Sequence, residues 1–264
     1  MGPYAALGGR TVQGTIGIMG GVQEVPVPFV MSLSDMLQYN YEHALARLER
    51  VRVTSAFCSL HSAARNQLAR DFSGAFLLML DTDMVHQADA MCRLRRTMLF
   101  HDADVVSGVY YKTNPPHFPA LWAWDAEDQF FREAMVAPDV QGPFRVDAAG
   151  AGILMLSRRV IERVKAEHGT DPFDIEPGAA KGHPPFGEDL SFFRKLLLLN
   201  PRPKVLCHPG VVSRHLRWQP VGPEDNEYEL SKLIVSKDDP AHDRSMVALY
   251  DGQELDVKKL RPGA

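Results

Sequence analysis

The strongest constraint on this chain is a continuous apolar run over residues 75–80 that ends in the acidic motif Asp81-Thr82-Asp83. A run without polar interruption is typical of a β-strand covered on both faces, as in a parallel sheet. This run and a second one at residues 152–156 are far shorter than the roughly 20 residues that cross a bilayer. We therefore expect an internal sheet strand and no membrane span.

Strand and helix patterns alternate on either side of this run. The strand patterns cover residues 15–19, 51–56, 103–110, 145–156 and 204–207, and the helical patterns cover residues 62–72, 87–100, 158–167 and 188–199. An earlier helix is expected to start at a Ser34 cap and to carry Tyr41, Leu45 and Leu48 at helical spacing. This alternation predicts an α/β fold, with a Rossmann-like, mostly parallel sheet flanked by helices.

The chain is expected to form one folded domain and a tail. Residues 1–218 carry the strand and helix patterns, whereas residues 219–264 are polar and weakly patterned. We interpret this C-terminal extension as a segment that wraps the surface or joins copies of the chain into a homo-oligomer. Within the domain, residues 112–144 lose their periodicity among prolines and tryptophans, which predicts a long irregular excursion that faces a substrate.

Composition argues against several classes of function. With 29 Lys and Arg against 33 Asp and Glu, the net charge is −4, so no broad cationic surface is expected and no nucleic-acid partner. The 3 cysteines are far apart and form no CxxC pair, which argues against a disulfide framework or a thiolate zinc site. The first residues show no basic segment followed by an apolar one, and we expect a cytoplasmic protein.

Asp81 and Asp83 are the first candidates for chemistry. On a regular strand, side chains two residues apart share a face, and unpaired charge is costly inside an apolar strand. The two carboxylates should therefore lie at the carboxyl end of the strand, where open α/β sheets bind ligands. Hard oxygen donors there suit Mg²⁺ or Mn²⁺ together with substrate phosphates. The simpler interpretation is an acidic turn that ends the strand.

Glu188 and Asp189 form a second acidic pair, at the start of a predicted helix and after a loop rich in Gly, Ala and Pro over residues 178–187. A carboxylate there can accept a proton from a hydroxyl nucleophile, and the loop could close over the site and exclude water. The helix terminus favours the charged form, whereas burial would raise the pKa. Acidic residues in a first helical turn are also common as simple capping residues.

His208 and His215 lie around a Pro-Gly turn near the end of the patterned region. A neutral imidazole can complete a metal site that carboxylates begin, and such a ligand suits Mn²⁺ better than Mg²⁺. Either histidine is equally consistent with a hydrogen-bonded core or surface residue.

Together these features resemble the metal-dependent glycosyltransferases of the GT-A fold, close to the broad family-two group and its small bacterial and phage-encoded relatives. No single motif decides the resemblance, because DxD is short and frequent; the order of the motifs carries it, over roughly residues 11–218. The segments concerned are 28–33, 64–66, 81–83, 105–110, 150–154, 188–192 and a final His215.

The resemblance implies a donor site. It gives Asp81 and Asp83 to a divalent cation, Mn²⁺ or Mg²⁺, that bridges the diphosphate of a nucleotide sugar, most simply of UDP type. It makes Asp83 the more direct ligand and His215 the late metal-binding histidine. It also makes Arg65 the basic residue that contacts the nucleotide.

The resemblance also implies an acceptor site. Asp189 matches the base of inverting members, with Glu188 beside it as a second catalytic carboxylate. The segment Gly150–Gly152 resembles the one beneath the donor sugar and the acceptor, which is a hydroxyl compound that the sequence does not identify. Residues 112–144 match nothing in the family pattern.

Two other functions are open from the sequence. The strand and DxD also match haloacid-dehalogenase-type phosphohydrolases, in which Asp81 would be the nucleophile and Asp83 an acid or base. In that superfamily the motif ends the first strand, whereas here two strand–helix units precede it. A non-catalytic glycan-binding module would instead stack Trp122 and Trp124 on a sugar, although both aromatic residues are equally expected in a core.

Overall fold

A computed structural model describes residues 12–20, 25–43, 50–137, 139–176, 185–216, 246–250 and 253–255. Its central sheet has seven strands in the order β2 (Arg50–Phe57), β1 (Val12–Gly20), β3 (Phe76–Asp81), β10 (Ile153–Ser157), β5 (Val105–Val109), β11 (Val205–Val212) and β8 (Phe144–Arg145). Strand β1 pairs in parallel with β2 and β3, and β11 pairs in parallel with β5. Strand β10 runs antiparallel between β3 and β5, and β8 is antiparallel to β11.

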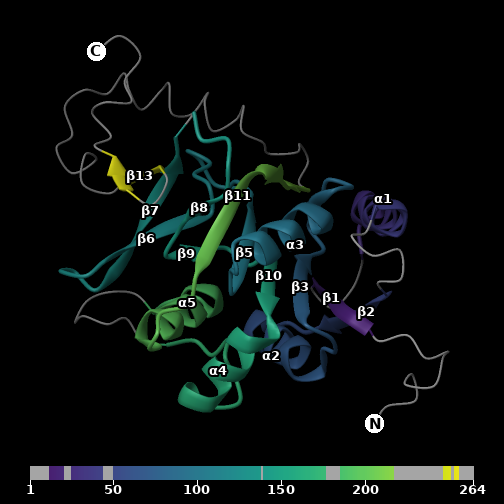
Figure 1. Cartoon of the computed structure of the whole chain (residues 1–264), viewed down its shortest axis with the longest axis horizontal. Helices are drawn as coiled ribbons and strands as arrows, with labels where there is room; N and C mark the ends of the chain where they lie inside the picture. Colours follow the sequence, from purple (N-terminus) through teal and green to yellow (C-terminus); the bar gives the residue numbers. More distant parts are fainter. Residues whose placement is uncertain are drawn as a thin grey trace.

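Helices cover both faces of this sheet (Figure 1). They are α1 (Val27–His43), α2 (His61–Asp71), α3 (Ala90–Phe100), α4 (Arg158–His168) and α5 (Glu188–Leu198). Side chains of α1 and α3 belong to one hydrophobic cluster, and those of α2, α4 and α5 belong to the other. The predicted α/β fold, a mostly parallel sheet between helices, is confirmed. None of the helices described is both long and apolar enough to cross a membrane.

Strand β3 lies near the middle of the sheet and joins the two clusters. Leu77 and Met79 pack against the cluster of α2, α4 and α5, whereas Leu78 and Leu80 pack against that of α1 and α3. All four side chains are fully buried. The apolar run therefore has no polar face because neither of its faces meets water, and its first polar residue, Asp81, stands where the strand ends.

Helix α1 begins earlier than the Ser34 cap predicted from the sequence. Its first residue is Val27, so Pro28 lies in the first turn, where a missing backbone N–H breaks no intrahelical bond. The prolines therefore start this helix instead of delaying it, and Ser34 lies inside it as an exposed residue. The predicted positions Leu45 and Leu48 lie outside the described residues.

Part of the segment 112–144, which was predicted to be an irregular excursion, forms regular strands. It contributes β6 (Leu121–Asp125) and β7 (Phe130–Val136), which pair as an antiparallel hairpin. These strands belong to a second sheet in the order β14 (Gln253–Leu255), β13 (Met246–Tyr250), β7, β6 and β9 (Ala148–Ala149). The alternation of strand residues was hidden in the sequence by the aromatic residues on both faces of the hairpin.

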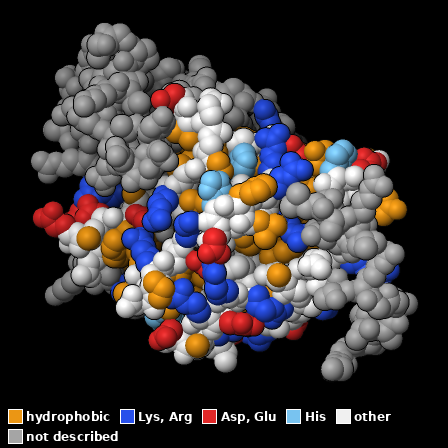
Figure 2. All heavy atoms as spheres, viewed as in Figure 1, with side chains coloured by type: hydrophobic (Ala, Val, Ile, Leu, Met, Phe, Trp, Pro, Cys, Tyr) orange, Lys and Arg blue, Asp and Glu red, His pale blue; other side chains and the backbone are white. Residues whose placement is uncertain are grey.

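The proposed C-terminal extension, residues 219–264, is described only at β13 and β14. Strand β13 pairs in parallel with β7, so part of the extension belongs to the second sheet. Its role in wrapping or association stays a prediction. Figure 2 shows basic, acidic and apolar side chains interspersed over one face of the described residues.

Candidate active site

The carboxyl ends of the parallel strands meet at one edge of the central sheet, and the predicted site residues gather there. Asp81 closes β3, and its backbone N–H donates to the carbonyl of Gly152 at 3.1 Å. The next amide, of Thr82, donates to the carbonyl of Met19 on β1 at 2.9 Å. The acidic motif is thus fixed on both sides by backbone hydrogen bonds, as expected for residues at a ligand-binding crevice.

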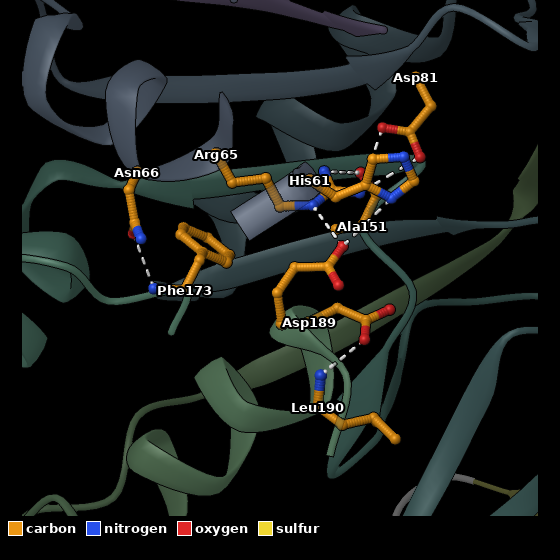
Figure 3. Close-up of polar contacts among 9 residues, drawn as sticks. His61, Arg65, Asn66, Asp81, Ala151, Phe173, Asp189 and Leu190 are labelled. Carbon is orange, nitrogen blue, oxygen red and sulfur yellow. Dashed lines mark hydrogen bonds and ion pairs between the residues drawn. The ribbon is translucent and has the colours of Figure 1, made fainter. Parts of the chain in front are cut away.

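Arg65, from α2, lies at the centre of this edge (Figure 3). Its side chain is only 3% exposed. The guanidinium donates to Glu188 Oε1 at 3.2 Å and to Asp81 Oδ2 at 3.3 Å, and to the carbonyl of Ala151 at 3.2 Å. Burial alone would lower the pKa of Arg65, but the neighbouring carboxylates raise it, so the group stays a cation.

Asn66, the next residue of α2, fixes a second part of the site. Its side-chain oxygen accepts the backbone N–H of Phe173 at 2.8 Å, and its amide donates to Asp174 Oδ1 at 3.3 Å. The segment around Phe173 and Asp174 continues to Glu176, whose carbonyl accepts the N–H of Phe186 at 3.0 Å. One turn of α2 therefore holds both the acidic motif, through Arg65, and the segments that lead into α5.

The carboxylate of Asp81 is largely buried, and its protein neighbours use only part of its hydrogen-bonding capacity. Burial raises the pKa of Asp81, Arg65 opposes this shift, and the charge of Asp83 adds to it. The Oδ1 atom is buried and has no hydrogen-bond partner, although it lies 3.3 Å from the Arg65 guanidinium as an ion pair. A buried carboxylate oxygen without a donor fits a cation ligand.

A short antiparallel ladder brings the backbones of Asp83 and His215 close together. Strand β12 (Arg214–His215) pairs antiparallel with β4 (Met84–Val85), and the N–H of Leu216 donates to the carbonyl of Asp83 at 2.6 Å. His215 Nδ1 lies 2.7 Å from the carbonyl of Tyr111. A carbonyl can only accept, so Nδ1 carries the hydrogen and Nε2 keeps the lone pair that a metal requires.

Asp81, Asp83 and His215 supply carboxylate and imidazole donors of the kinds that bind Mn²⁺ or Mg²⁺. Within the described ranges, no three His, Cys, Asp or Glu side chains already converge in a metal-binding arrangement. His208, the other candidate, accepts the N–H of Gly210 at 3.1 Å. Burial lowers the pKa of His208, and the neighbouring charge of Arg93 lowers it further. Of the two histidines, His215 is the one that the structure pairs with the acidic motif.

Glu188 and Asp189 open α5 and face the same edge. Glu188 accepts from Arg65, and the Asp189 carboxylate accepts the N–H of Leu190 at 2.8 Å. Burial and the neighbouring charge of Glu188 raise the pKa of Asp189 to about 6, against the opposing effect of Arg65. A carboxylate with this pKa is ionised at neutral pH and remains basic enough to accept a proton.

Phe186 packs the start of α5 against the second sheet. It is 2% exposed, and its ring lies 5.8 Å from that of Phe130 and 5.7 Å from that of Phe131 between ring centroids. Trp124 also packs against it. The hairpin β6–β7 therefore forms an aromatic socket for Phe186, three residues before Asp189, and sets where the helix begins.

Gly150 and Gly152 are glycines because other side chains occupy the space of a Cβ. At Gly150 a Cβ would lie 1.8 Å from the hydroxyl oxygen of Tyr110, and at Gly152 it would lie 2.2 Å from the Met84 methyl carbon. Tyr110 was not among the site residues predicted from the sequence. Its only sequence signal was its place just after a buried strand, at the edge where ligands bind.

Substitution of Gly150 with alanine is expected to destabilise the protein and to reduce activity, because the new methyl group would overlap the Tyr110 hydroxyl. Overpacking of this kind costs about 1–3 kcal/mol. Gly142→Ala is the matched control, since no atom lies within 4 Å of a Cβ there. Thermal denaturation of the two variants checks the prediction, which an equal melting temperature for both would contradict.

Trp122 and Trp124 pack inside the structure. Trp122 is 9% exposed, and the Lys112 ammonium lies over its ring at 4.8 Å. Trp124 is half-buried against Phe131 and Phe186. These contacts make both tryptophans part of the second sheet's core, and they leave no observation that favours the glycan-binding module.

Comparison with known sequences finds a family that part of the chain resembles. Residues 42–163 match the sequence model described as Glycosyl transferase family 2. Because this segment is less than half of the chain, we describe the chain as family-two-like, meaning similar to that family. Arg65, Asp81 and Asp83 lie inside the matched segment of this family-two-like chain, whereas Asp189 and His215 lie outside it. A comparison with proteins of curated function finds no match.

Three solved structures are similar to the family-two-like chain. A197 from STIV has 18% identity and a TM-score of 0.48, over 80% of this chain and 91% of that one. GalNAc-T7, crystallised with UDP, GalNAc and Mn²⁺, has 13% identity and a TM-score of 0.49, over 78% and 43%. HddC from Yersinia pseudotuberculosis has 10% identity and a TM-score of 0.41, over 84% and 100%.

Proposed function

We propose that this family-two-like chain transfers a sugar from a nucleotide-diphosphate donor, most simply a UDP-sugar, to a hydroxyl acceptor with inversion at the anomeric carbon. The observation that carries the proposal is that two acidic side chains from distant elements both pair with the guanidinium of Arg65. Arg65 contacts Asp81, at the end of β3, and Glu188, beside Asp189 at the start of α5. Asp81 and Glu188, which are 107 positions apart in the sequence, therefore pair with the same side chain.

The donor half of the proposal rests on Asp81, Asp83 and His215. The orphaned oxygen of Asp81 and the free Nε2 of His215 support a divalent cation, Mn²⁺ or Mg²⁺, held by these three residues. When bound, this cation would neutralise negative charge on the leaving diphosphate. Arg65 adds a second positive charge at the same edge, in a buried environment where it is little screened.

The acceptor half rests on Asp189. In a single displacement, the bond from the anomeric carbon to the diphosphate oxygen breaks while a bond to the acceptor oxygen forms on the opposite face. The acceptor proton passes to the Asp189 carboxylate, and the nucleoside diphosphate leaves with the bonding electrons. A pKa of about 6 keeps Asp189 ionised at neutral pH for this step.

Asp83→Ala is expected to abolish both transfer and the thermal stabilisation by UDP with Mn²⁺, because it removes an exposed cation ligand. Asp83 is exposed, so the variant should melt at the wild-type temperature without ligand. Ligand at 100 times its Kd stabilises a protein by about 2.7 kcal/mol, a shift that differential scanning measures. Asp35→Ala, an exposed aspartate of α1, is the control and should keep the shift.

The same preparations separate the proposal from its alternatives. Persistence of the UDP and Mn²⁺ shift in Asp83→Ala would contradict the assigned donor site. Release of phosphate from simple phosphomonoesters, with an acyl phosphate trapped on Asp81, would instead establish the phosphohydrolase. Glycan binding in the absence of either activity would establish the non-catalytic module.

A further inference from the structure

Tyr110 is the aromatic residue that follows β5, and it reaches into the centre of the site. Its hydroxyl oxygen occupies the space above Gly150, where a Cβ would lie 1.8 Å away. Its ring also borders Gly152, where a Cβ would lie 3.2 Å from Cε1. Two glycines in the segment 150–152 thus make room for one phenol side chain, which fixes where its hydroxyl lies.

Tyr110 also contacts the metal side of the site. Its ring packs edge-on against His215, with a centroid distance of 5.2 Å and an interplanar angle of 74°. The segment on which Tyr110 packs joins it to the rest of the site, because the Gly152 carbonyl accepts the backbone N–H of Asp81 and the Ala151 carbonyl accepts from Arg65, which pairs with Glu188. Tyr110 therefore stands among the group proposed to bind the cation, the carboxylate that ends β3 and the proposed base.

The hydroxyl of Tyr110 is a hydrogen-bond donor. A tyrosine phenol is protonated at neutral pH, so its O–H can donate. Tyr110 is half-buried, and no acceptor among the described residues takes its hydrogen, which can therefore bond to a ligand.

The chemistry of the proposed reaction says what lies in front of this hydroxyl. The diphosphate leaves on the side of Asp81 and Asp83, and the attacking oxygen is deprotonated on the side of Asp189. The atoms between these two sides are those of the transferred sugar. Tyr110 packs on His215 and on the segment 150–152, whose backbone carbonyls bind Asp81 and Arg65, and it therefore borders that sugar.

We propose that the Tyr110 hydroxyl donates a hydrogen bond to an oxygen of the transferred sugar, and that Tyr110 is a sugar-recognition residue of this enzyme. The inference rests on the proposed function and deepens it. A sugar without an oxygen at the matching position would leave the hydroxyl of this half-buried residue unpaired, which is an unfavourable mismatch. Tyr110 would thereby discriminate between donor sugars that carry the same nucleotide.

Tyr110→Phe is the direct test, because it removes one oxygen and keeps the ring that packs on His215. We expect kcat/KM for the preferred UDP-hexose to fall about tenfold or more, in line with the loss of a hydrogen bond in a buried site. The Kd for UDP with Mn²⁺, measured by calorimetry, should stay within about twofold of the wild-type value, since UDP lacks the transferred hexose. Tyr41→Phe, on an exposed tyrosine of α1, is the matched control.

A second measurement keeps the test independent of how well the variant folds. Deoxy analogues of the UDP-hexose are compared on the wild-type protein, where one of them should lose about as much kcat/KM as Tyr110→Phe does. That analogue should lose nothing further on the Tyr110→Phe protein. Additive losses for every analogue would show that the hydroxyl and the sugar do not meet, and would overturn the inference.

The outcomes separate this inference from the proposed function. Absence of UDP binding and of transfer in the wild-type protein would overturn the function itself. Wild-type binding and transfer with an unchanged kcat/KM in Tyr110→Phe would overturn only the sugar contact. Equal losses of UDP affinity and kcat/KM would assign Tyr110 to support of His215, which also contradicts sugar recognition.

Discussion

Asp189→Asn is expected to lower kcat for glycosyl transfer about 10²–10⁴-fold, which is the usual contribution of a positioned general base. The substitution keeps the size and planarity of the side chain, and the amide oxygen can still accept the N–H of Leu190. It removes only the ability to take a proton. Transfer assays beside UDP binding by calorimetry check the result, because donor binding should persist in the variant.

The pH dependence of the wild-type protein gives the same prediction a second readout. Asp189 acts as a base only when ionised, so kcat/KM should rise as the pH rises through about 6 and level off above it. Glu188→Gln removes the like charge that helps to raise the pKa of Asp189, and should move this rise to lower pH. An unchanged pH profile in Asp189→Asn would contradict its role as the base.

The raised pKa also predicts the sign of a stability effect. A carboxyl group whose pKa is higher in the folded than in the unfolded state binds more protons when folded, so its contribution to stability falls as the pH rises through that interval. For Asp189 the interval runs from the ordinary value of 3.8 to about 6. Asp189→Asn should therefore melt at a higher temperature than the wild-type protein above pH 6.

Arg65→Met is expected to destabilise the fold by about 3–5 kcal/mol, the cost of breaking a buried ion pair from one side. The methionine has a similar length but leaves the carboxylates of Asp81 and Glu188 without their shared cation. Buried charge without a partner is the reason for the large effect. Chemical denaturation measures the loss, and transfer activity should disappear with it because Asp81 is no longer held.

Arg70→Met, on the same helix, is the matched control. Arg70 pairs with Asp171 at 2.5 Å, but both side chains are more than 40% exposed, and exposed pairs contribute about 0–1 kcal/mol. Adding Asp81→Asn to Arg65→Met should recover part of the stability, since it removes one of the two uncompensated charges. Equal losses for Arg65→Met and Arg70→Met would refute a central role for Arg65.

The sequence allowed prediction of those parts of the fold that depend on local patterns. The apolar run before Asp81 predicted an internal strand because burial on both faces leaves a continuous signature. The start of α5 at Glu188 followed from acidic residues in a first helical turn. The Ser34 cap was wrong because Pro28 is as compatible with a first turn as with a break, and only packing against the sheet decides between the two.

The contacts across the site could not be predicted from the sequence. That Arg65 faces Glu188, 123 residues away, depends on the order of strands in the sheet, which no local pattern encodes. Tyr110 was missed for the same reason, because its importance comes from Gly150 and Gly152 on another strand connection. The assignments of Asp189 and His215 to base and cation ligand stay predictions that the experiments above test.

The aromatic socket around Phe186 has a consequence for how such a chain can change its acceptor. Asp81 and Thr82 are held in the central sheet by backbone hydrogen bonds, whereas the start of α5, which carries Asp189, packs on the neighbouring hairpin through Phe186. Repacking Phe130 or Phe131 would tilt the start of α5 while leaving Asp81 and its backbone partners undisturbed. Under the proposed function, substitutions in that hairpin would therefore alter the acceptor side of the reaction and leave the nucleotide side unchanged.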